Sequence, residues 1–181
     1  QKNLNLLSAN GDVALLKAKL KSNDADIRVE ANNISLNSEA EAKNLTFIAS
    51  NELNADQNTI LKSTDIVDLQ ARNANISGQI FSSDQSIKAS EALNLKQNLV
   101  VSANNQLNLT AKDLTISGEL YSKNSTINAS NSLTQDKSAT QSNAETLKVN
   151  AAKVSLAGKT YTNNAEIEST DLSVKNTAKL Y

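Results

Sequence analysis

The sequence contains no cysteine, histidine, proline, methionine or tryptophan. Without His or Cys, the usual nucleophile–base pairs and the common zinc sites cannot be built, so no catalytic, metal or cofactor residues are predicted. The lack of cysteine fits a reducing compartment, and it equally fits a secreted chain that crosses a pore unfolded. The lack of proline leaves the backbone N–H groups available as donors, as a sheet with few free edges requires.

Charge of one sign is also lacking, since 18 basic and 19 acidic residues are spread without long runs. Nucleic acid and anionic membranes are therefore not expected partners. No apolar run is long enough to span a membrane, so membrane insertion is not expected either. The first residues, QKNLNLLSANGD, lack the layout of a signal peptide. We expect residues 1–181 to form one domain, an internal slice of a longer protein.

What the sequence does contain is a repeat. The stretch LNLTAKDLTISGELYS at 107–122 returns 40 residues later as LKVNAAKVSLAGKTYT. Glycines recur with the same spacing, at Gly78, Gly118 and Gly158, where we expect a bend in which a Cβ would be costly. An aromatic residue follows each glycine by three positions. A fixed period of this kind indicates a stacked repeat architecture.

The 40-residue period divides into units of 20, each with three apolar columns. The first column is Leu7, Ile27, Phe47, Val67, Ile87, Leu107, Ile127, Leu147 and Ile167. The second is Leu20, Ala40, Ile60, Ile80, Val100, Leu120, Thr140, Thr160 and Leu180. The third is Val13, Ile34, Leu53, Ala74, Leu93, Leu114, Leu133, Val154 and Leu172. Apolar residues alternate with polar ones within a unit, which predicts half-buried strands.

Two further columns describe the packing and the turns. Small and large residues alternate along Ala9, Val29, Ala49, Leu69, Ala89, Leu109, Ala129, Val149 and Ser169, which predicts interdigitation of successive units. Turn-forming residues recur along Asp24, Asn44, Thr64, Asp84, Asn104, Asn124 and Asn164. The 26 asparagines of the chain count against a helical fold. Together the columns predict an all-β parallel β-helix of about nine turns, called rungs below, with three short strands per rung.

These residues resemble the haemagglutinin repeats of filamentous-haemagglutinin-like exoproteins, the large secreted partner of bacterial two-partner secretion systems. The resemblance rests on LNLTAKDLTISGELYS, LKVNAAKVSLAGKTYT, INASNSL and IKASEALNL, and it extends from about Leu4 to Leu180. It implies a right-handed β-helix that is exported unfolded through an outer-membrane transporter and folds outside the cell. Members act as adhesins or present a toxin in contact-dependent growth inhibition.

The resemblance also sets expectations for location and partners. It implies a protein that is secreted or held at the bacterial cell surface, with a host or bacterial receptor or glycan as partner. The amino-terminal secretion domain of the family typically carries Asn-Pro motifs, and this chain has no proline. The outer-membrane transporter would therefore be engaged by a segment outside this sequence. The exposed sheet edges at both ends of the helix also allow end-to-end self-association.

Three groups of residues are candidates for chemistry or binding. The first group combines aspartates with arginines, which could form a lyase-like cleft or a calcium site. We favour the alternative that these residues form an ordinary solvated surface. The group consists of Asp24, Asp26 and Arg28 together with Asp65, Asp68 and Arg72. Phe81, Tyr121 and Tyr161 should line up on alternate rungs, roughly 10 Å apart, either to bind a sugar or protein partner or to cover a corner. Gln135 interrupts the apolar pattern, so residues 134–145 should form a hydrogen-bonded interior or a bulge, with a binding role as the alternative.

The leading hypothesis is thus a rigid stalk or adhesin segment that supports cell adhesion or toxin delivery. A receptor- or glycan-binding module is the second hypothesis, and a polysaccharide lyase or hydrolase is the third.

Overall fold

The structure is a computed structural model that describes residues 3–22 and 24–181. Those residues form β-strands joined by turns, and no helix occurs among them. The strands are β1 (Leu4–Leu7), β2 (Val13–Lys21), β3 (Ile27–Ala55), β4 (Ile60–Ile116), β5 (Glu119–Gln135), β6 (Thr140–Leu156), β7 (Lys159–Glu168), β8 (Asp171–Val174) and β9 (Lys179–Leu180).

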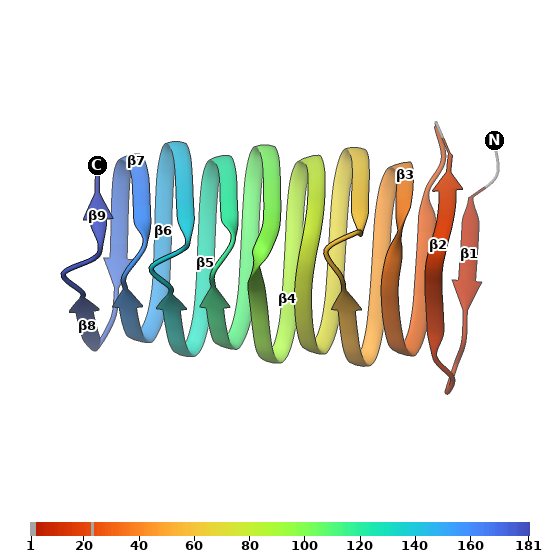
Figure 1. Cartoon of the computed structure of the whole chain (residues 1–181), viewed down its shortest axis with the longest axis horizontal. Helices are drawn as coiled ribbons and strands as arrows, with labels where there is room; N and C mark the ends of the chain where they lie inside the picture. Colours follow the sequence, from red (N-terminus) through yellow and green to blue (C-terminus); the bar gives the residue numbers. More distant parts are fainter. Residues whose placement is uncertain (1–2, 23) are drawn as a thin grey trace.

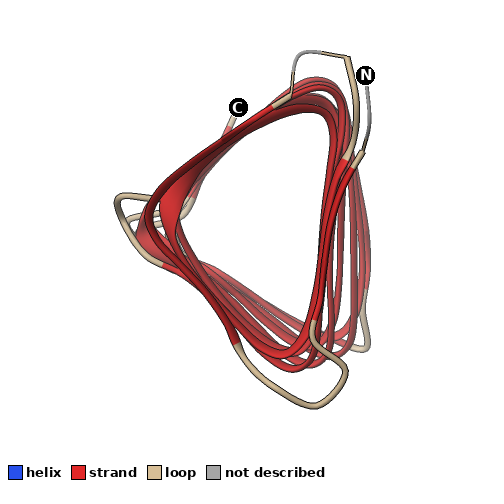
Figure 2. Ribbon diagram, turned by 90° about the vertical axis from the view of Figure 1, so that its right-hand side faces the viewer, coloured by secondary structure: helices blue, strands red, loops and turns tan. Residues whose placement is uncertain are grey.

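The strands pair in parallel and form one sheet that coils around a single axis. Figure 1 shows the rungs side by side along a rod, with the two termini at opposite ends. Each rung is a triangle when viewed along the rod, with three flat faces and three corners (Figure 2). The protein is therefore a parallel β-solenoid of about eight turns, close to the nine rungs that the sequence predicted.

Side chains alternate between the interior and solvent along each face, as the period-two pattern predicted. In β6, for example, Val149 and Ala151 are buried, whereas Lys148 and Asn150 are exposed. Each fully buried leucine or isoleucine contributes roughly 1.5–3 kcal/mol to the free energy of unfolding. The apolar interior is therefore the main source of stability.

The third predicted column is confirmed by the strand register. Leu133 of β5 pairs with Leu114 of β4 on one side and with Val154 of β6 on the other. Val13 pairs likewise with Ile34 near the N-terminus. This column needed no correction because its predicted spacing already varied by a residue between rungs.

The first predicted column is wrong, because it assumed that every rung has the same length. Leu107 pairs with Ser125, and not with Ile127 as a constant step requires. Ser125 in turn pairs with Leu147, and Leu147 pairs with Ala165. A shorter and a longer rung thus alternate on this face, and only their sum repeats along the chain. Counting a constant 20 residues along the sequence therefore leads alternately to one and then the other of two neighbouring inward columns.

Individual members of that column therefore pair with residues other than those predicted. Ile127 pairs with Leu109, at the neighbouring inward position. At the N-terminus, Leu4 rather than Leu7 pairs with Ile27. Leu7 is 68% exposed, so it faces solvent rather than the core.

The predicted alternation of small and large residues is wrong for the same reason. Ala129 pairs with alanines on both sides, Ala111 and Ala151. The large residues form their own column beside it, in which Leu109 pairs with Ile127. The alanine column lies where the face meets a corner, and small side chains fit there because the chain turns inward.

The second predicted column is displaced by one residue on alternate rungs. On these rungs the inward position is occupied by the residue that follows the predicted one. Leu61 lies there instead of Ile60, Val101 instead of Val100, and Gln141 instead of Thr140. The cause is a longer corner segment on those rungs, at 56–59, 96–99 and 136–139.

The longer corners also explain the glycine column, because each glycine lies against the corner segment of the preceding rung. A Cβ on Gly158 would lie 2.5 Å from the carbonyl oxygen of Ala139, and one on Gly118 would lie 2.6 Å from that of Lys96. Gly78 additionally has a φ of 89°, which disfavours any side chain. The prediction of a bend without room for a Cβ is confirmed. The long period of the sequence therefore consists of one rung with a long corner followed by one rung with a glycine.

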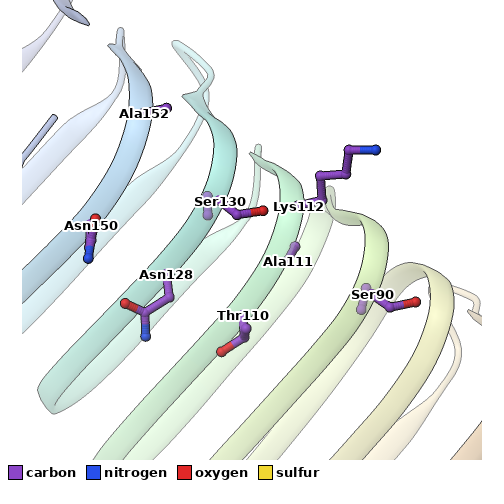
Figure 3. Close-up of a pocket in the computed structure, with 10 residues that line it drawn as sticks. Ser90, Thr110, Ala111, Lys112, Asn128, Ser130, Asn150 and Ala152 are labelled. Atoms are coloured by element: carbon purple, nitrogen blue, oxygen red, sulfur yellow. The ribbon is translucent and has the colours of Figure 1, made fainter. Parts of the chain in front are cut away.

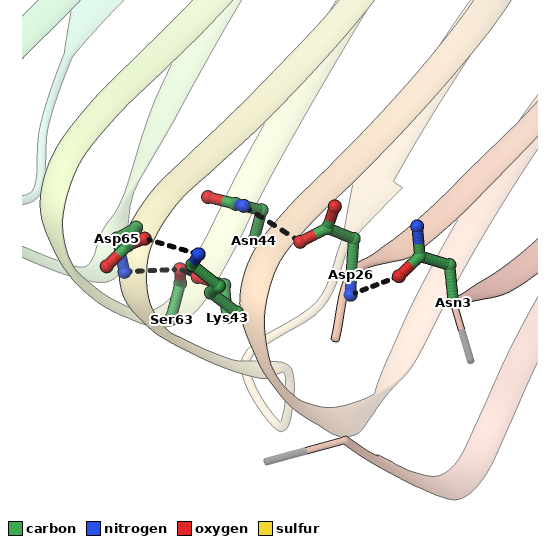
Figure 4. Close-up of polar contacts among 6 residues, drawn as sticks. All are labelled: Asn3, Asp26, Lys43, Asn44, Ser63 and Asp65. Carbon is green, nitrogen blue, oxygen red and sulfur yellow. Dashed lines mark hydrogen bonds and ion pairs between the residues drawn. The ribbon is translucent and has the colours of Figure 1, made fainter. Parts of the chain in front are cut away.

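A second corner is held by asparagine and aspartate side chains, as predicted, but the constant step of the predicted turn column is wrong. Asn124 pairs with Gln106, and not with Asn104. Likewise, Asn44 pairs with Ile66, and not with Thr64. Asn44 Nδ2 donates a 2.8 Å hydrogen bond to Asp26 Oδ1, and the backbone N–H of Asp26 donates to Asn3 Oδ1 at 3.1 Å (Figure 4). On later rungs, Thr146 Oγ1 donates to Asn124 Oδ1. Each bond joins one rung to the next, so this corner also keeps the rungs in register.

Candidate functional site

Tyr121 and Tyr161 lie in one outward column, and the 40-residue repeat of the sequence puts Phe81 in the same column. Tyr121 pairs with Ser142, and Ser142 pairs with Tyr161, so the two tyrosines occupy alternate rungs as predicted. Ser102 precedes Tyr121 in the same column. We call the set Phe81, Ser102, Tyr121, Ser142, Tyr161 and Tyr181 the aromatic column.

Tyr181 is a member that the sequence analysis missed. Its ring stacks on Tyr161 with a centroid separation of 4.6 Å and an interplanar angle of 5°. Tyr181 follows Tyr161 by one 20-residue unit, whereas the predicted aromatic row was based on the 40-residue spacing of the glycines. The chain has five aromatic residues, and four of them are in this column. The fifth, Phe47, is fully buried in the core.

Tyr121 has a specific electrostatic partner. Its hydroxyl donates a 2.7 Å hydrogen bond to Glu119 Oε2, and the residue is 38% exposed. This hydrogen bond, with burial and the carboxylate charge adding to it, raises the pKa of the Tyr121 phenol above its ordinary value.

Replacing Glu119 by Gln is expected to lower the pKa of Tyr121 towards that of a free tyrosine. In the native protein, the contribution of this pair to stability is present below the unfolded pKa and is lost as the pH rises through the raised folded pKa. An NMR titration of the labelled tyrosine rings measures the pKa in both proteins. An unchanged Tyr121 pKa in the Glu119→Gln variant would show that the carboxylate is not the cause.

The carboxylates considered for a lyase-like or calcium site are engaged with neighbouring side chains. Asp26 accepts a hydrogen bond from a side-chain amide at 2.8 Å, and Asp65 lies 3.8 Å from a lysine ammonium (Figure 4). Asp68 also accepts a hydrogen bond from a side-chain amide, at 2.6 Å. Arg28 forms an ion pair with Glu30 on its own strand. Within residues 3–22 and 24–181, no group of three His, Cys, Asp or Glu side chains is placed to hold a metal ion.

A shallow groove of about 380 Å³ runs across four rungs beside the alanine column (Figure 3). Its lining consists of alanines and polar side chains, among them Ser90, Thr110, Asn128 and Asn150. The single charged group in the lining, Lys112, is paired with Glu91 at 3.1 Å. The groove therefore offers hydrogen-bonding groups but no pair of titratable groups for acid–base chemistry.

The region around Gln135 is a hydrogen-bonded interior, one of the two outcomes expected for residues 134–145. Gln135 is buried, and its Nε2 donates to Thr160 Oγ1 at 3.1 Å. Asn143, also buried, donates to the hydroxyl oxygens of Ser122 and Ser125 at 2.7 and 2.6 Å. The sequence analysis missed Asn143, because the assumed constant step had assigned the neighbouring residues to the wrong columns.

A cavity of about 300 Å³ adjoins these amides at the C-terminal end of the core. Its lining is mostly apolar and includes Leu147, Ile167 and Leu180, together with Gln135 and Gln141. Among the described residues, Gln135 Oε1 and Gln141 Nε2 have no hydrogen-bond partner. The close packing of the core is therefore interrupted at this end.

The described part of the chain contains no helix that is long and apolar enough to cross a membrane. Comparison with family models, with curated proteins and with solved structures gave no match.

Proposed function

We propose that the chain is a rigid stalk segment of a secreted bacterial exoprotein of the filamentous-haemagglutinin type. Its role is to hold adhesive or toxic parts of that protein away from the cell surface. The observation that carries this proposal is the parallel ladder from β1 to β9, which coils around one apolar core. At about 4.8 Å per turn, eight turns form a rod roughly 38 Å long.

The stiffness of such a rod follows from its bonding. Bending would separate neighbouring rungs on one side, which would break backbone hydrogen bonds and expose core side chains to water. Side chains on the outside add further links between rungs. Asn75 accepts from Asn94 at 3.1 Å and donates to Asn54 at 3.0 Å, so these amides form a ladder across three rungs. A stack that is linked inside and outside resists bending.

The fold also suits export of an unfolded chain. Each rung contacts mainly the rungs next to it, so a solenoid of this kind can form progressively as the chain emerges. The sequence has no cysteine and no proline, so neither disulfide formation nor proline isomerisation delays this process. We assign contact with the outer-membrane transporter to a segment outside this sequence.

The proposal is tested by placing residues 1–181 behind the amino-terminal secretion domain of a two-partner system and expressing the fusion with its transporter. We expect the segment to reach the medium and to resist protease there. The matched control is Ile116→Asp, which should be exported but digested. Retention of the native sequence inside the cell, or its digestion in the medium, would contradict the proposal.

A second function, binding of a receptor or glycan, is favoured by the gathering of four of the five aromatic residues in one outward column. Aromatic side chains supply much of the binding energy at protein and carbohydrate interfaces. Replacing Tyr121 and Tyr161 by Ala should then weaken binding to cells or glycan arrays by at least tenfold. Unchanged binding would remove the aromatic column as the binding site.

A further inference from the structure

Large and small side chains alternate along the aromatic column, so that a second copy of the column could fit against it with large side chains opposite small ones. Ser142 lies on the rung between Tyr121 and Tyr161. Ser102 lies on the rung before Tyr121. The 40-residue repeat, which relates Phe81 to Tyr121 as it relates Tyr121 to Tyr161, puts Phe81 on the rung before that. Along the rod, rings therefore alternate with serines, and we call the position of each small serine between two larger rings a slot.

The slots have the thickness of one aromatic ring. Tyr161 and Tyr181, on adjacent rungs, are stacked at 4.6 Å with nearly parallel planes, so rings on this face can stack at the rung spacing. Rings that are two rungs apart are separated by roughly 9.6 Å, which leaves room for one further ring between them. The slots above Ser102 and Ser142 therefore each fit a planar side chain inserted from outside.

The orientation of the stack restricts what can bind. Because Tyr161 and Tyr181 stack along the rod, their ring faces point along its axis and their edges point to solvent. A sugar chain lying on the surface would meet ring edges rather than ring faces, which is the weaker arrangement. A partner that inserts its own rings at a two-rung spacing would instead meet the ring faces. This chain itself carries such a set of rings.

The geometry points to a second copy of this chain as the partner, packed antiparallel with the two aromatic columns facing each other. Phe81 and Tyr121 of each copy enter the slots at Ser142 and Ser102 of the other. A two-fold axis across the rods relates the copies, so the contact is the same from both sides and closes as a dimer. This inference concerns one face of the rod and does not depend on the proposed role as an exoprotein stalk.

The charges on this face favour the same register. The outward column beside the aromatic one includes Glu39 near the N-terminus and Lys179 near the C-terminus, and this alignment brings them opposite each other. A shift by two rungs in one direction would place Lys159 opposite Lys19, and a shift in the other would place Phe81 against Tyr181. Of these three alignments, the proposed one alone avoids both the contact between two lysines and the contact between two rings at the same level.

The interface is a single face of a narrow rod, so its area falls at the small end of specific protein–protein interfaces. We therefore expect a dissociation constant in the micromolar range.

The test is sedimentation velocity of the 181-residue chain over a concentration series that spans the micromolar to millimolar range. A monomer–dimer equilibrium is expected. A ladder of higher oligomers would indicate end-to-end stacking and would overturn the proposal, as would a monomer at all concentrations.

Two variants locate the interface. Ser142→Tyr fills one slot and should weaken the dimer at least tenfold, although it adds an aromatic residue to the surface. Tyr121→Ser removes one inserted ring and should weaken it similarly. Ser155→Tyr is the matched control, because Ser155 is half-buried in the outward column of another face and pairs with Thr134. Circular dichroism and thermal unfolding of each variant establish that the fold is retained.

Tyrosine fluorescence provides a second measurement, since all three tyrosines of the chain are in the aromatic column. Dimerisation should change their emission in the native chain and in Ser155→Tyr. Equal dimer affinities for Ser142→Tyr and Ser155→Tyr would overturn the proposal. Oligosaccharide binding to a chain that stays monomeric would overturn it as well and would favour a glycan as the partner.

Discussion

Replacing Ile116 by Asp is expected to unfold several rungs and to lower the free energy of unfolding by at least about 4 kcal/mol. Ile116 is 1% exposed, and it pairs with Gln135 of the next rung. The variant must either bury a carboxylate in a mainly apolar interior or raise the pKa of that carboxyl at a similar cost. Because each rung is stabilised mainly by its neighbours, the loss should spread to rungs on both sides. Chemical denaturation measured by circular dichroism gives the change in stability.

Thr115→Asp is the matched control, because Thr115 is the preceding residue and points outward. It pairs with Thr134 on the next rung, and both side chains are partly in contact with solvent. We expect a change within about 0.5 kcal/mol. If the two variants unfolded at the same denaturant concentration, the assignment of inward and outward positions would be wrong.

Replacing Gly78 by Ala is expected to destabilise the protein by more than about 3 kcal/mol, a large effect for one methyl group. The new Cβ would lie 2.2 Å from the carbonyl oxygen of Thr59 and 2.8 Å from that of Asp56. Both are backbone atoms of the long corner beneath it, so neither can move away without disturbing that rung. The φ of 89° adds strain to the alanine backbone. Thermal unfolding measured by calorimetry tests the prediction.

Gly11→Ala serves as the control for the loss of a glycine. Its Cβ would meet Ser8 Oγ at 2.7 Å, but that atom is at the end of a side chain that can rotate. Gly11 is also exposed, and its φ is outside the left-handed region. We expect a change of less than about 1 kcal/mol. A Gly78→Ala variant as stable as Gly11→Ala would mean that the rungs do not stack as described.

The candidate site was only partly predictable from the sequence. The spacing of Phe81, Tyr121 and Tyr161 correctly placed Tyr121 and Tyr161 on alternate rungs of one face. It did not reveal that Tyr181 continues the column or that the rings stack along the rod. Ring orientation depends on side-chain torsions and on contacts between rungs, which no spacing encodes. The finding that Tyr161 and Tyr181 stack on each other therefore required the structure.

The class of fold could be inferred from the sequence alone. Period-two alternation requires half-buried strands, and a long fixed period over the chain requires stacked units, because the repeated residues can share one core only in that way. The third apolar column could be read correctly from the sequence, since its members are large in nearly every rung. The glycine column was also readable, because a recurring glycine marks a place without room for a side chain.

The alignment of the rungs could not be inferred from the sequence and depends on the three-dimensional fold. The constant step seen in the sequence is the average of a shorter and a longer rung on one face, and apolar residues stand at neighbouring inward positions in both kinds of rung. A hydrophobic pattern cannot separate two adjacent inward columns, because both are apolar. The backbone hydrogen bonds between rungs and the length of each corner fix that choice, and both depend on residues that are distant in the chain.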